Sequence, residues 1–316
     1  MADGLVGNGQ KASQIDMIKI NKITRGRFGN RILQYNSAYQ LSKLLETNLF
    51  CAPWEGFQFF DNLYTCPIES KRDQKIIKWI DLPPFSNKQW DSIKSLHNEF
   101  DLTIDDPAYV LHNAFYHVTN IHPRVFIKIK PEYTPQLPSD SINVGLHFRG
   151  DDIISADGNA GREIHSDSYY IRSIELIDKE YPGDKKRYFL CTDDAKFDTF
   201  IKTIEYMNDR DHEYYMGPAT LQQDKVNHFF DFSLLAHCDI LIASSSTYAI
   251  TAGFLGKEKR IIHSKDWLQK NIDHQPWWAP IRVADGFTRS QQLSFDDFWV
   301  KVATGGNDFY NAWRIV

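Results

Sequence analysis

Short apolar runs alternate with amphipathic stretches through the second half of the chain. Brief apolar runs are typical of buried strands, and apolar residues three or four positions apart indicate helices. The pattern predicts strands over 142–148, 187–192, 213–215, 239–243 and 260–263, and helices near 166–180, 197–204, 221–237, after 247 and over 296–302. This alternation predicts a parallel sheet wound by right-handed crossovers.

The first half of the chain begins with a strand, a glycine-containing turn and a helix. Residues 15–23 predict the strand, the turn covers 24–30, and apolar residues at helical spacing continue to Leu45. A second strand is predicted over 49–52. Three prolines between 131 and 138 indicate a stiff connection, so we expect one domain over residues 1–138 and another over 139–316.

Charge and cysteine content narrow the class of partner. The chain of 316 residues has 36 Lys and Arg against 41 Asp and Glu, a net charge of −5, which argues against nucleic acid or an anionic membrane as the main partner. Its 4 cysteines lack the spacing of a zinc site or a disulfide scaffold. No apolar run is long enough to span a membrane, and the start of the chain lacks a signal-peptide core. We therefore expect a soluble, cytoplasmic protein with reduced core thiols.

Polar side chains follow three predicted strands at their carboxyl ends. They are Arg149, Asp151 and Asp152 after the first, Asp193 and Asp194 after the second, and Ser244, Ser245, Ser246 and Thr247 after the third. The carboxyl ends of parallel strands in a doubly wound sheet open onto one crevice. A guanidinium fork matches a diphosphate, and serines at a helix amino terminus offer hydroxyls and amides to phosphate. The sequence therefore predicts a sugar-nucleotide site.

A second anion site is predicted at the glycine turn Gly26–Asn30, because a strand, a turn and a helix amino terminus direct free amides and the positive dipole end the same way. Asp231, within an apolar helical segment, has two interpretations. The favoured one is an exposed helix residue. The other is a carboxylate that accepts from the ring NH and amino group of guanine.

Four motifs, in order, resemble elements of the GDP-fucose-dependent fucosyltransferases. Gly26–Asn30, GRFGN, is similar to the GRFGNQ or GRLGNQ turn of protein O- and alpha-1,2-fucosyltransferases. His147–Asp151, HFRGD, resembles their HxR or HxRRGD element. Phe189–Asp194, FLCTDD, resembles the ATDD or FSDD strand end of the alpha-1,6 and alpha-1,2 enzymes, and Asp231–Ser246 resembles the D-x7-D…SS block of the superfamily. Together the motifs span most of the chain.

The resemblance implies an α/β, GT-B-like glycosyltransferase with two Rossmann-like domains facing a central cleft, the first on the acceptor side and the second binding the GDP-sugar. It implies inverting transfer of fucose from GDP-fucose to a hydroxyl of a glycan or peptide, without a metal ion or a cofactor. Arg149 would hold the β-phosphate and stabilise departing GDP. The other implied contacts are Arg27, Gly29 and Asn30 from the first domain, His147 and Asp231 for guanine, Asp193 and Asp194 for the base or ribose side, and Ser245 or Ser246 for the phosphates, with Ser244 and Thr247 beside them.

The chain departs from the family pattern at Gly150, where many relatives have a second arginine, so Arg149 is the only guanidinium of the HFRGD motif. The general base is a second open point. An inverting transfer needs a carboxylate near the acceptor hydroxyl unless the leaving phosphate takes the proton. Glu163, at about the place of the alpha-1,6 enzyme's catalytic glutamate, is the first candidate and Asp152 the second, with Asp151 in the same loop.

Three alternatives stay open. An enzyme of the same fold could use another GDP-sugar such as GDP-mannose, because the motifs address the diphosphate and the base more than the sugar. A metal-dependent transferase could use Asp209–Asp211 as a DxD motif, which its polar turn disfavours. A non-catalytic nucleotide-sugar or glycan-binding module is disfavoured by the presence of Arg149 and Asn30. The sequence does not identify the acceptor, although Trp277 and Trp278 are candidates for stacking on a sugar.

Overall fold

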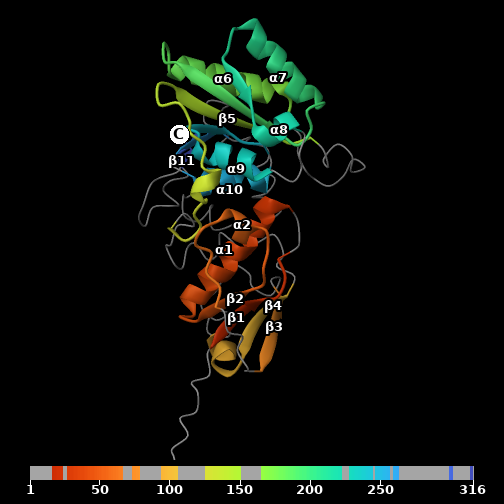
Figure 1. Cartoon of the computed structure of the whole chain (residues 1–316), viewed down its shortest axis with the longest axis vertical. Helices are drawn as coiled ribbons and strands as arrows, with labels where there is room; N and C mark the ends of the chain where they lie inside the picture. Colours follow the sequence, from red (N-terminus) through yellow and green to blue (C-terminus); the bar gives the residue numbers. More distant parts are fainter. Residues whose placement is uncertain are drawn as a thin grey trace, which may run out of the picture.

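Two β-sheets, each with its own helices, follow one another along the long axis of the computed structural model (Figure 1). The structure describes residues 16–23, 27–66, 73–78, 94–105, 125–150, 165–222, 228–244, 246–256, 259–262, 299–301 and 314–315. The strands of the first sheet all precede residue 106, and those of the second all follow residue 141. The predicted domain boundary at 138 lies between the two sheets and stays a prediction.

The first sheet has 4 strands in the order β2-β1-β4-β3, all parallel. Its elements are β1 (Met17–Ile20), α1 (Phe28–Leu44), β2 (Asn48–Cys51), α2 (Gly56–Phe59), β3 (Gln74–Lys78) and β4 (Asp101–Asp105). All four residues of β1 are buried, and Lys19 pairs with Asp101 of β4 at 3.7 Å with both side chains fully buried. The chain leaves the carboxyl end of β1 and enters α1, as the strand, turn and helix pattern predicts.

The second sheet has 7 strands in the order β11-β10-β9-β8-β5-β6-β7. Its strands are β5 (Ile142–Phe148), β6 (Lys186–Thr192), β7 (Tyr214–Met216), β8 (Ile240–Ile242), β9 (Arg260–Ile262), β10 (Trp299–Lys301) and β11 (Arg314–Ile315). Its helices are α6 (Asp167–Glu180), α7 (Asp198–Asp209), α8 (Pro218–Gln222), α9 (His228–His237) and α10 (Thr247–Leu255), and a 3-10 turn, η3 (Pro131–Tyr133), precedes the sheet. The strands β9, β8, β5, β6 and β7 are parallel to one another. Strand β10 runs antiparallel to β9, and β11 runs antiparallel to β10. The predicted α/β fold with parallel sheets is confirmed.

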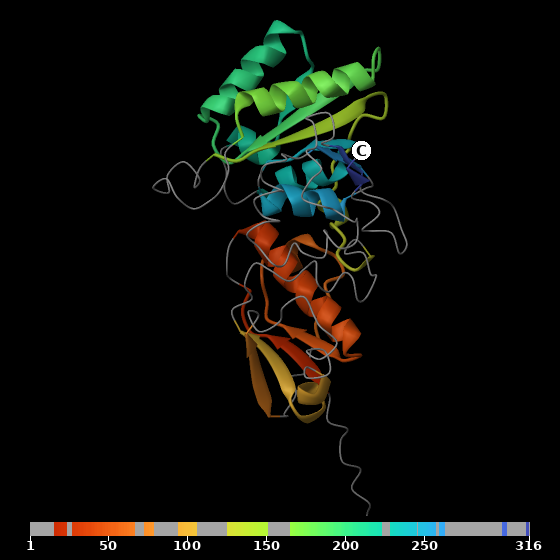
Figure 2. The same ribbon diagram turned by 180° about the vertical axis from the view of Figure 1, so that it is seen from behind.

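Helices cover both faces of the second sheet. Helices α6 and α7 lie on the face turned away from the first sheet, whereas α9 and α10 lie between the two sheets (Figures 1 and 2). Buried residues of α9 and α10, such as Phe232 and Ile250, belong to the same hydrophobic core as Ile18 and Leu49 of the first sheet. A continuous apolar core therefore joins the two halves of the chain.

Two predicted helices are wrong. The structure has two helices, α8 and α9, where one helix was expected over 221–237. The Asp231 carboxylate of α9 accepts hydrogen bonds from the amides of Ala219 and Thr220 in α8, so the two segments lie side by side. In one continuous helix, residues 11 or 12 positions apart would lie about 17 Å apart. The expected closing helix over 296–302 contains strand β10, which pairs with β9. A short apolar segment fits either period, and pairing with β9 satisfies its backbone groups.

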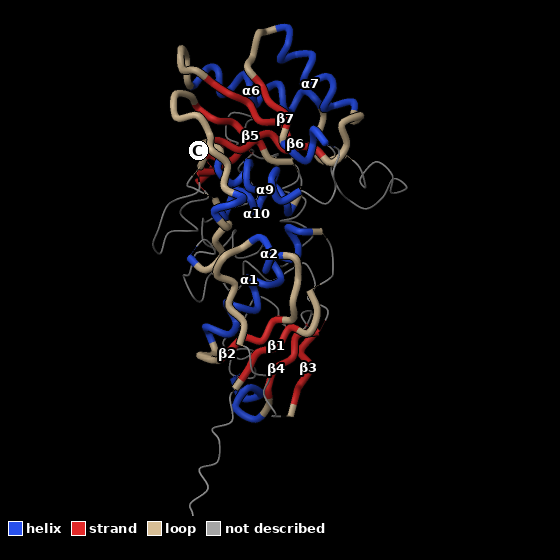
Figure 3. The backbone as a smooth tube through the Cα atoms, in the orientation of Figure 1, coloured by secondary structure: helices blue, strands red, loops and turns tan. Residues whose placement is uncertain are grey.

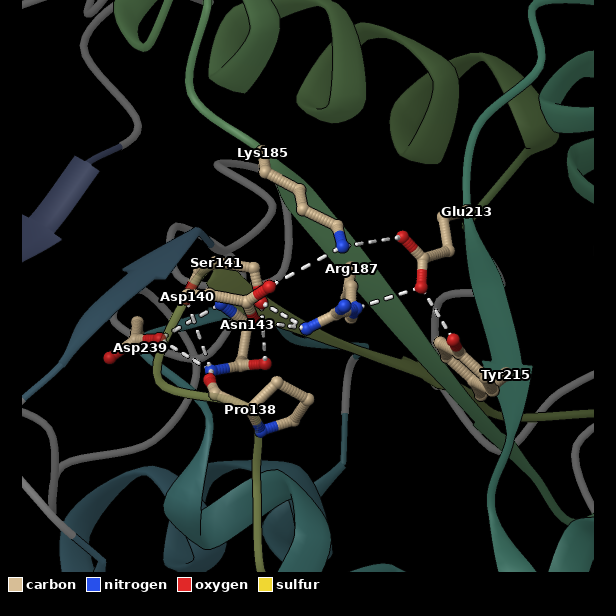
Figure 4. Close-up of polar contacts among 9 residues, drawn as sticks. All are labelled: Pro138, Asp140, Ser141, Asn143, Lys185, Arg187, Glu213, Tyr215 and Asp239. Atoms are coloured by element: carbon tan, nitrogen blue, oxygen red, sulfur yellow. Dashed lines mark hydrogen bonds and ion pairs between the residues drawn. The ribbon is translucent and has the colours of Figure 1, made fainter.

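The amino-terminal edge of the second sheet carries a network of ion pairs (Figure 4). Arg187, at the start of β6, contacts Asp140, and its Nε lies 2.7 Å from Glu213. Lys185 lies 3.7 Å from Glu213. Asn143 joins the start of β5 to Asp239 with a 2.8 Å hydrogen bond from its amide. Because Asp140, Lys185, Arg187 and Glu213 each have an oppositely charged partner, we interpret this edge as structural.

The four cysteines are all buried, as predicted, and none of them forms a disulfide. None of the described helices has the length and hydropathy needed to cross a membrane. Within the described residues, no three His, Cys, Asp or Glu side chains are grouped so that they could hold a metal ion. Asp209 ends α7 and Asp211 lies in the following turn with a φ of 55°, which places the alternative DxD motif in a turn.

Candidate functional site

The first turns of α1 and α10 meet at the junction between the two sheets. A Cβ added to Gly29 would lie 2.5 Å from the backbone carbon of Thr247 and from the amide nitrogen of Tyr248. Only glycine allows this approach. Helix amino termini carry partial positive charge and free amides, so two such ends adjoin here. Among the described residues, no side chain caps α1, and its first turn holds no acidic residue.

Two arginines from opposite sides of the junction contact one carboxylate. Arg27, at the start of α1, and Arg149, after β5, each place Nη1 3.0 Å from Oδ2 of Asp193, which follows β6. The other oxygen of Asp193 accepts a 2.8 Å hydrogen bond from the amide of Gly150. Arg27 is 46% exposed, whereas Arg149 and Asp193 are 12% and 18% exposed. The site therefore brings two guanidiniums to one carboxylate, at the junction where the first turns of α1 and α10 adjoin.

His147 lies beneath this group, at the end of β5. Its Nδ1 lies 2.6 Å from Oγ of Ser244, and its ring centroid lies 5.1 Å from that of Tyr248 in α10. Burial lowers the pKa of His147 to about 3, with the Asp193 charge opposing that shift and the Arg149 charge adding to it. A neutral imidazole is therefore held between β5 and the strand end of β8. Its contact with Ser244 accounts for one nitrogen of the ring.

The serine run forms the amino terminus of α10, as predicted. Ser246 caps the helix, with Oγ accepting from the amide of Tyr248 at 3.3 Å, and Thr247 begins it. Ser245 lies outside the described residues. Asn30, in the first turn of α1, has a buried Oδ1 with no hydrogen-bond partner among the described residues. Such an atom is costly unless a further group donates to it, which makes Asn30 a candidate ligand contact.

Asp231 is buried, so its favoured interpretation as an exposed residue is wrong. Its Oδ1 accepts from the amide of Ala219 at 2.8 Å, and its Oδ2 accepts from the hydroxyl of Thr220 at 2.7 Å and from the Thr220 amide at 3.1 Å. Burial raises the pKa of Asp231, and the hydrogen bonds from Thr220 and Ala219 oppose this shift. The carboxylate caps α8 and ties it to α9.

Asp194 participates in the turn after β6. Its Oδ1 accepts from the amide of Lys196 at 2.9 Å, and its own amide donates to Oγ1 of Thr192. The structure therefore directs Asp193 to the arginines and Asp194 to the backbone of its own turn. Three predicted catalytic residues, Asp151, Asp152 and Glu163, and the tryptophans Trp277 and Trp278, lie outside the described residues.

One pair at this junction was missed from the sequence. Arg31, in α1, lies 2.8 Å from Glu55, the residue before α2. Arg31 is four positions after Arg27, which could have placed it on the same helix face. Glu55 has no distinguishing sequence context.

The structure resembles solved structures at low sequence identity. A mutant of Arabidopsis thaliana FUT1 in complex with GDP matches with a TM-score of 0.53 and 12% identity over 82% of this chain and 73% of that chain. The chain shares its fold with this protein. NodZ alpha-1,6-fucosyltransferase soaked with GDP-fucose gives a TM-score of 0.48 at 16% identity, over 80% and 96% of the two chains. POFUT1 in complex with GDP-fucose gives 0.49 at 12% identity, over 78% and 97%.

No protein-family model matches the sequence, and no curated protein matches it. At these identities the likeness concerns the fold, which is α/β and of the GT-B-like type that the motifs imply. A function has to be argued from the side chains at the junction, because one fold can carry many different functions.

Proposed function

We propose that the protein is an inverting, metal-independent fucosyltransferase that transfers fucose from GDP-fucose to a hydroxyl of a glycan or peptide. The observation that carries the proposal is the convergence of Arg27 and Arg149 on Asp193, beside the first turns of α1 and α10. Paired guanidiniums and helix amino termini are the groups that proteins use to bind phosphates. The FUT1 structure that shares the fold is a complex with GDP, which supports a GDP-sugar as donor.

In this proposal the junction binds the diphosphate of the donor. Arg149 is the less exposed of the two arginines and is held by Asp193, so it is preorganised to stabilise the charge that develops on the leaving diphosphate. Arg27 adds a second positive charge from the other side of the junction, and Asn30 and the amides of the helix starts add hydrogen bonds. Asp193 keeps the two guanidiniums together before the donor binds.

The neighbouring side chains support the donor site in different ways. His147 and Ser244 line the end of β5 as a neutral, hydrogen-bonded pair, and Ser246 and Thr247 supply the start of α10. Asp231 is assigned here to holding α8 against α9, because the side-chain hydrogen bonds that its carboxylate accepts within the described residues come from Ala219 and Thr220 of α8. The general base that takes the proton from the hydroxyl of the acceptor was predicted to be Glu163, Asp152 or Asp151. That prediction stays open.

The experiment measures GDP affinity and the release of GDP from GDP-fucose in the presence of EDTA. The wild-type protein should bind GDP and turn over GDP-fucose slowly with water as the acceptor. Arg149→Ala should lower turnover about 100- to 1000-fold, the usual loss for a donor that stabilises transition-state charge. Arg210→Ala, an exposed arginine after α7, is the matched control and should leave turnover unchanged. Protein without measurable affinity for GDP would refute the proposal.

The choice of sugar needs a separate measurement, because the described contacts address the diphosphate. A panel of GDP-fucose, GDP-mannose and GDP-glucose, followed by product mass, should give turnover with GDP-fucose and little with the others. Turnover with GDP-mannose alone would mean that GDP-mannose is the donor and that the proposed diphosphate site is still correct. GDP binding without turnover of any donor, together with glycan affinity that Arg149→Ala leaves intact, would indicate a binding module.

A further inference from the structure

A second pair of an arginine and a carboxylate lies one helical turn from the Arg27–Asp193 contact. Arg31 Nη1 lies 2.8 Å from Glu55 Oε1, with the two side chains 29% and 23% exposed. The amide of Arg31 donates to the carbonyl of Arg27 at 3.2 Å, so the two arginines are consecutive on one helix face, with Cβ atoms about 5–6 Å apart. A carboxylate of the first sheet's half therefore lies close to the proposed phosphate contacts.

The position of Glu55 is fixed by its two neighbours. The Trp54 ring is buried, with its centroid 6.3 Å from that of Phe28 in the first turn of α1. A Cβ on Gly56 would lie 2.3 Å from the Trp54 indole, so only glycine fits beneath that ring. Figure 3 shows α2, which begins just after Glu55, beside the first turns of α1 at the junction. The packing of Trp54 and Gly56 therefore fixes the backbone at Glu55.

The carboxylate is not used to stabilise the helix that follows it. Glu55 precedes α2, and its side chain makes no capping hydrogen bond there. It pairs with Arg31 and keeps about a quarter of its surface exposed. A buried structural pair, such as Lys19 with Asp101, has no exposed surface. The Arg31–Glu55 pair therefore combines a fixed position with access for a further molecule.

We propose, resting on the proposed function, that Glu55 contacts the acceptor hydroxyl and takes its proton, and that Arg31 is a positioning residue that orients Glu55. The acceptor oxygen forms a bond to the anomeric carbon of the donor, and the bond from that carbon to the diphosphate oxygen breaks. The electron pair of the broken bond leaves with the diphosphate, towards Arg149 and Arg27. The proton of the hydroxyl goes to the Glu55 carboxylate.

The spacing along α1 suits this reaction. In an inverting transfer the leaving oxygen and the attacking oxygen lie on opposite sides of the carbon, with the attacking atom about 3 Å away before reaction. A base lies about another 3 Å beyond the attacking oxygen. Arg27, which contacts the phosphate side, and Arg31, which holds the carboxylate, are one helical turn apart on α1, so one rigid element carries both the donor contact and the partner of the base. The rival base is Glu163 or Asp152 in the segment that follows Arg149.

The test uses GDP-fucose with water as the acceptor, so it requires no identified acceptor. Glu55→Gln should lower the turnover number for hydrolysis about 100-fold, with unchanged affinity for GDP. Glu132→Gln, which changes an exposed glutamate of η3, is the matched control and should behave as wild type. Arg31→Met should lower turnover as Glu55→Gln does, whereas Arg31→Lys, which keeps a positive charge beside Glu55, should retain part of it.

Azide separates a proton acceptor from a structural residue. Azide carries no proton, so it attacks the anomeric carbon without a base and gives fucosyl azide and GDP. In Glu55→Ala the ratio of fucosyl azide to fucose should therefore rise about 100-fold over wild type. An equal loss of both products, or unchanged hydrolysis in Glu55→Gln, would overturn the role of Glu55. Wild-type protein that fails to bind GDP would refute the proposed function instead, so the two failures can be told apart.

Discussion

Gly29 of α1 lies against the backbone of Thr247 of α10, at a separation that leaves no room for a side chain. An added Cβ would lie 2.5 Å from the carbonyl carbon of Thr247. The contact brings together two helix amino termini that belong to different sheets. A change at Gly29 should therefore affect both the stability of the junction and the binding of an anion there.

We predict that Gly29→Ala destabilises the protein by about 1–3 kcal/mol, the usual cost of overpacking, and weakens GDP binding at least tenfold. Urea unfolding and GDP titration measure the two effects. Gly145→Ala is the matched control: its Cβ would lie 3.0 Å from Cδ2 of Leu235, a side-chain atom that can move, and it should leave GDP affinity unchanged. Normal GDP affinity in Gly29→Ala would argue against the junction as the anion site.

Asp193 competes with a phosphate for the two arginines, because its Oδ2 contacts both Arg27 and Arg149. We predict that Asp193→Asn binds GDP about fivefold more tightly, since a nearby like charge costs about 1 kcal/mol at a partly exposed site. The same change should lower turnover of GDP-fucose, because the guanidiniums lose their common acceptor. Asp198→Asn, in the exposed first turn of α7, should change neither quantity. Weaker GDP binding in Asp193→Asn would instead indicate that the carboxylate orients the arginines in the complex.

Much of the fold could be predicted because its strands are short apolar runs with polar ends. The strand over 142–148 is observed with the predicted bounds, and the three polar strand ends lie on the same side of the second sheet. The role of Asp231 could not be predicted, because it depends on how α8 packs against α9. The contact of Arg27 with Asp193 joins residues 166 positions apart, and no local pattern encodes that docking. The pair of Arg31 and Glu55 depends on the same packing.

Asp231 should matter for stability rather than for base recognition. Its carboxylate accepts three hydrogen bonds from Ala219 and Thr220 in a buried setting. Asp231→Ala leaves these donors unsatisfied, so we predict a loss of about 2–4 kcal/mol in the free energy of unfolding. The preference for GDP over UDP, measured by competition, should stay as in the wild type. Normal stability of Asp231→Ala, combined with a lost preference for GDP over UDP, would support the interpretation that Asp231 contacts guanine.

His147 should make the protein sensitive to acid. Burial lowers its pKa to about 3 in the folded state, whereas an unfolded chain gives about 6.5. Below pH 6.5 the unfolded state therefore binds a proton that the folded state does not, and stability falls as the pH decreases towards 3. Between about pH 6.5 and pH 5 this difference amounts to about 2 kcal/mol.

We predict that His147→Gln loses about 2 kcal/mol less stability than the wild type over that interval. Urea unfolding of both proteins at the two pH values measures the difference. The variant lacks the titrating group and keeps an amide that can bond to Ser244. Carboxylates such as Asp140 and Glu213, whose pKa values are lowered by hydrogen bonds from Arg187 and from Tyr215 respectively, contribute equally to both proteins. Parallel stability curves for the two proteins would show that His147 titrates normally.

Phe28 connects the aromatic clusters of the two halves of the chain. Its ring centroid lies 5.6 Å from Phe59 in the first half and 5.1 Å from both Phe229 and Phe232 of α9. Phe28→Ala should cost about 3–5 kcal/mol, as for other buried aromatic residues. It should also weaken the contact between the halves, to which Phe59 contributes through Phe229 and Phe232, so that unfolding in urea shows two transitions. Phe126→Ala is the matched control, because Phe126 stacks on Tyr39 of α1 at 3.9 Å and, among the described residues, makes no ring contact with α9.

The control variant should be less stable and still unfold in one transition. Saturating GDP should restore a single transition in Phe28→Ala, because a ligand held by Arg27 and Arg149 links the halves and stabilises the folded state by mass action. Two transitions that persist at saturating GDP would mean that the nucleotide binds to one half of the chain. In that case Arg27 would have no part in the donor site, although Arg149 still could.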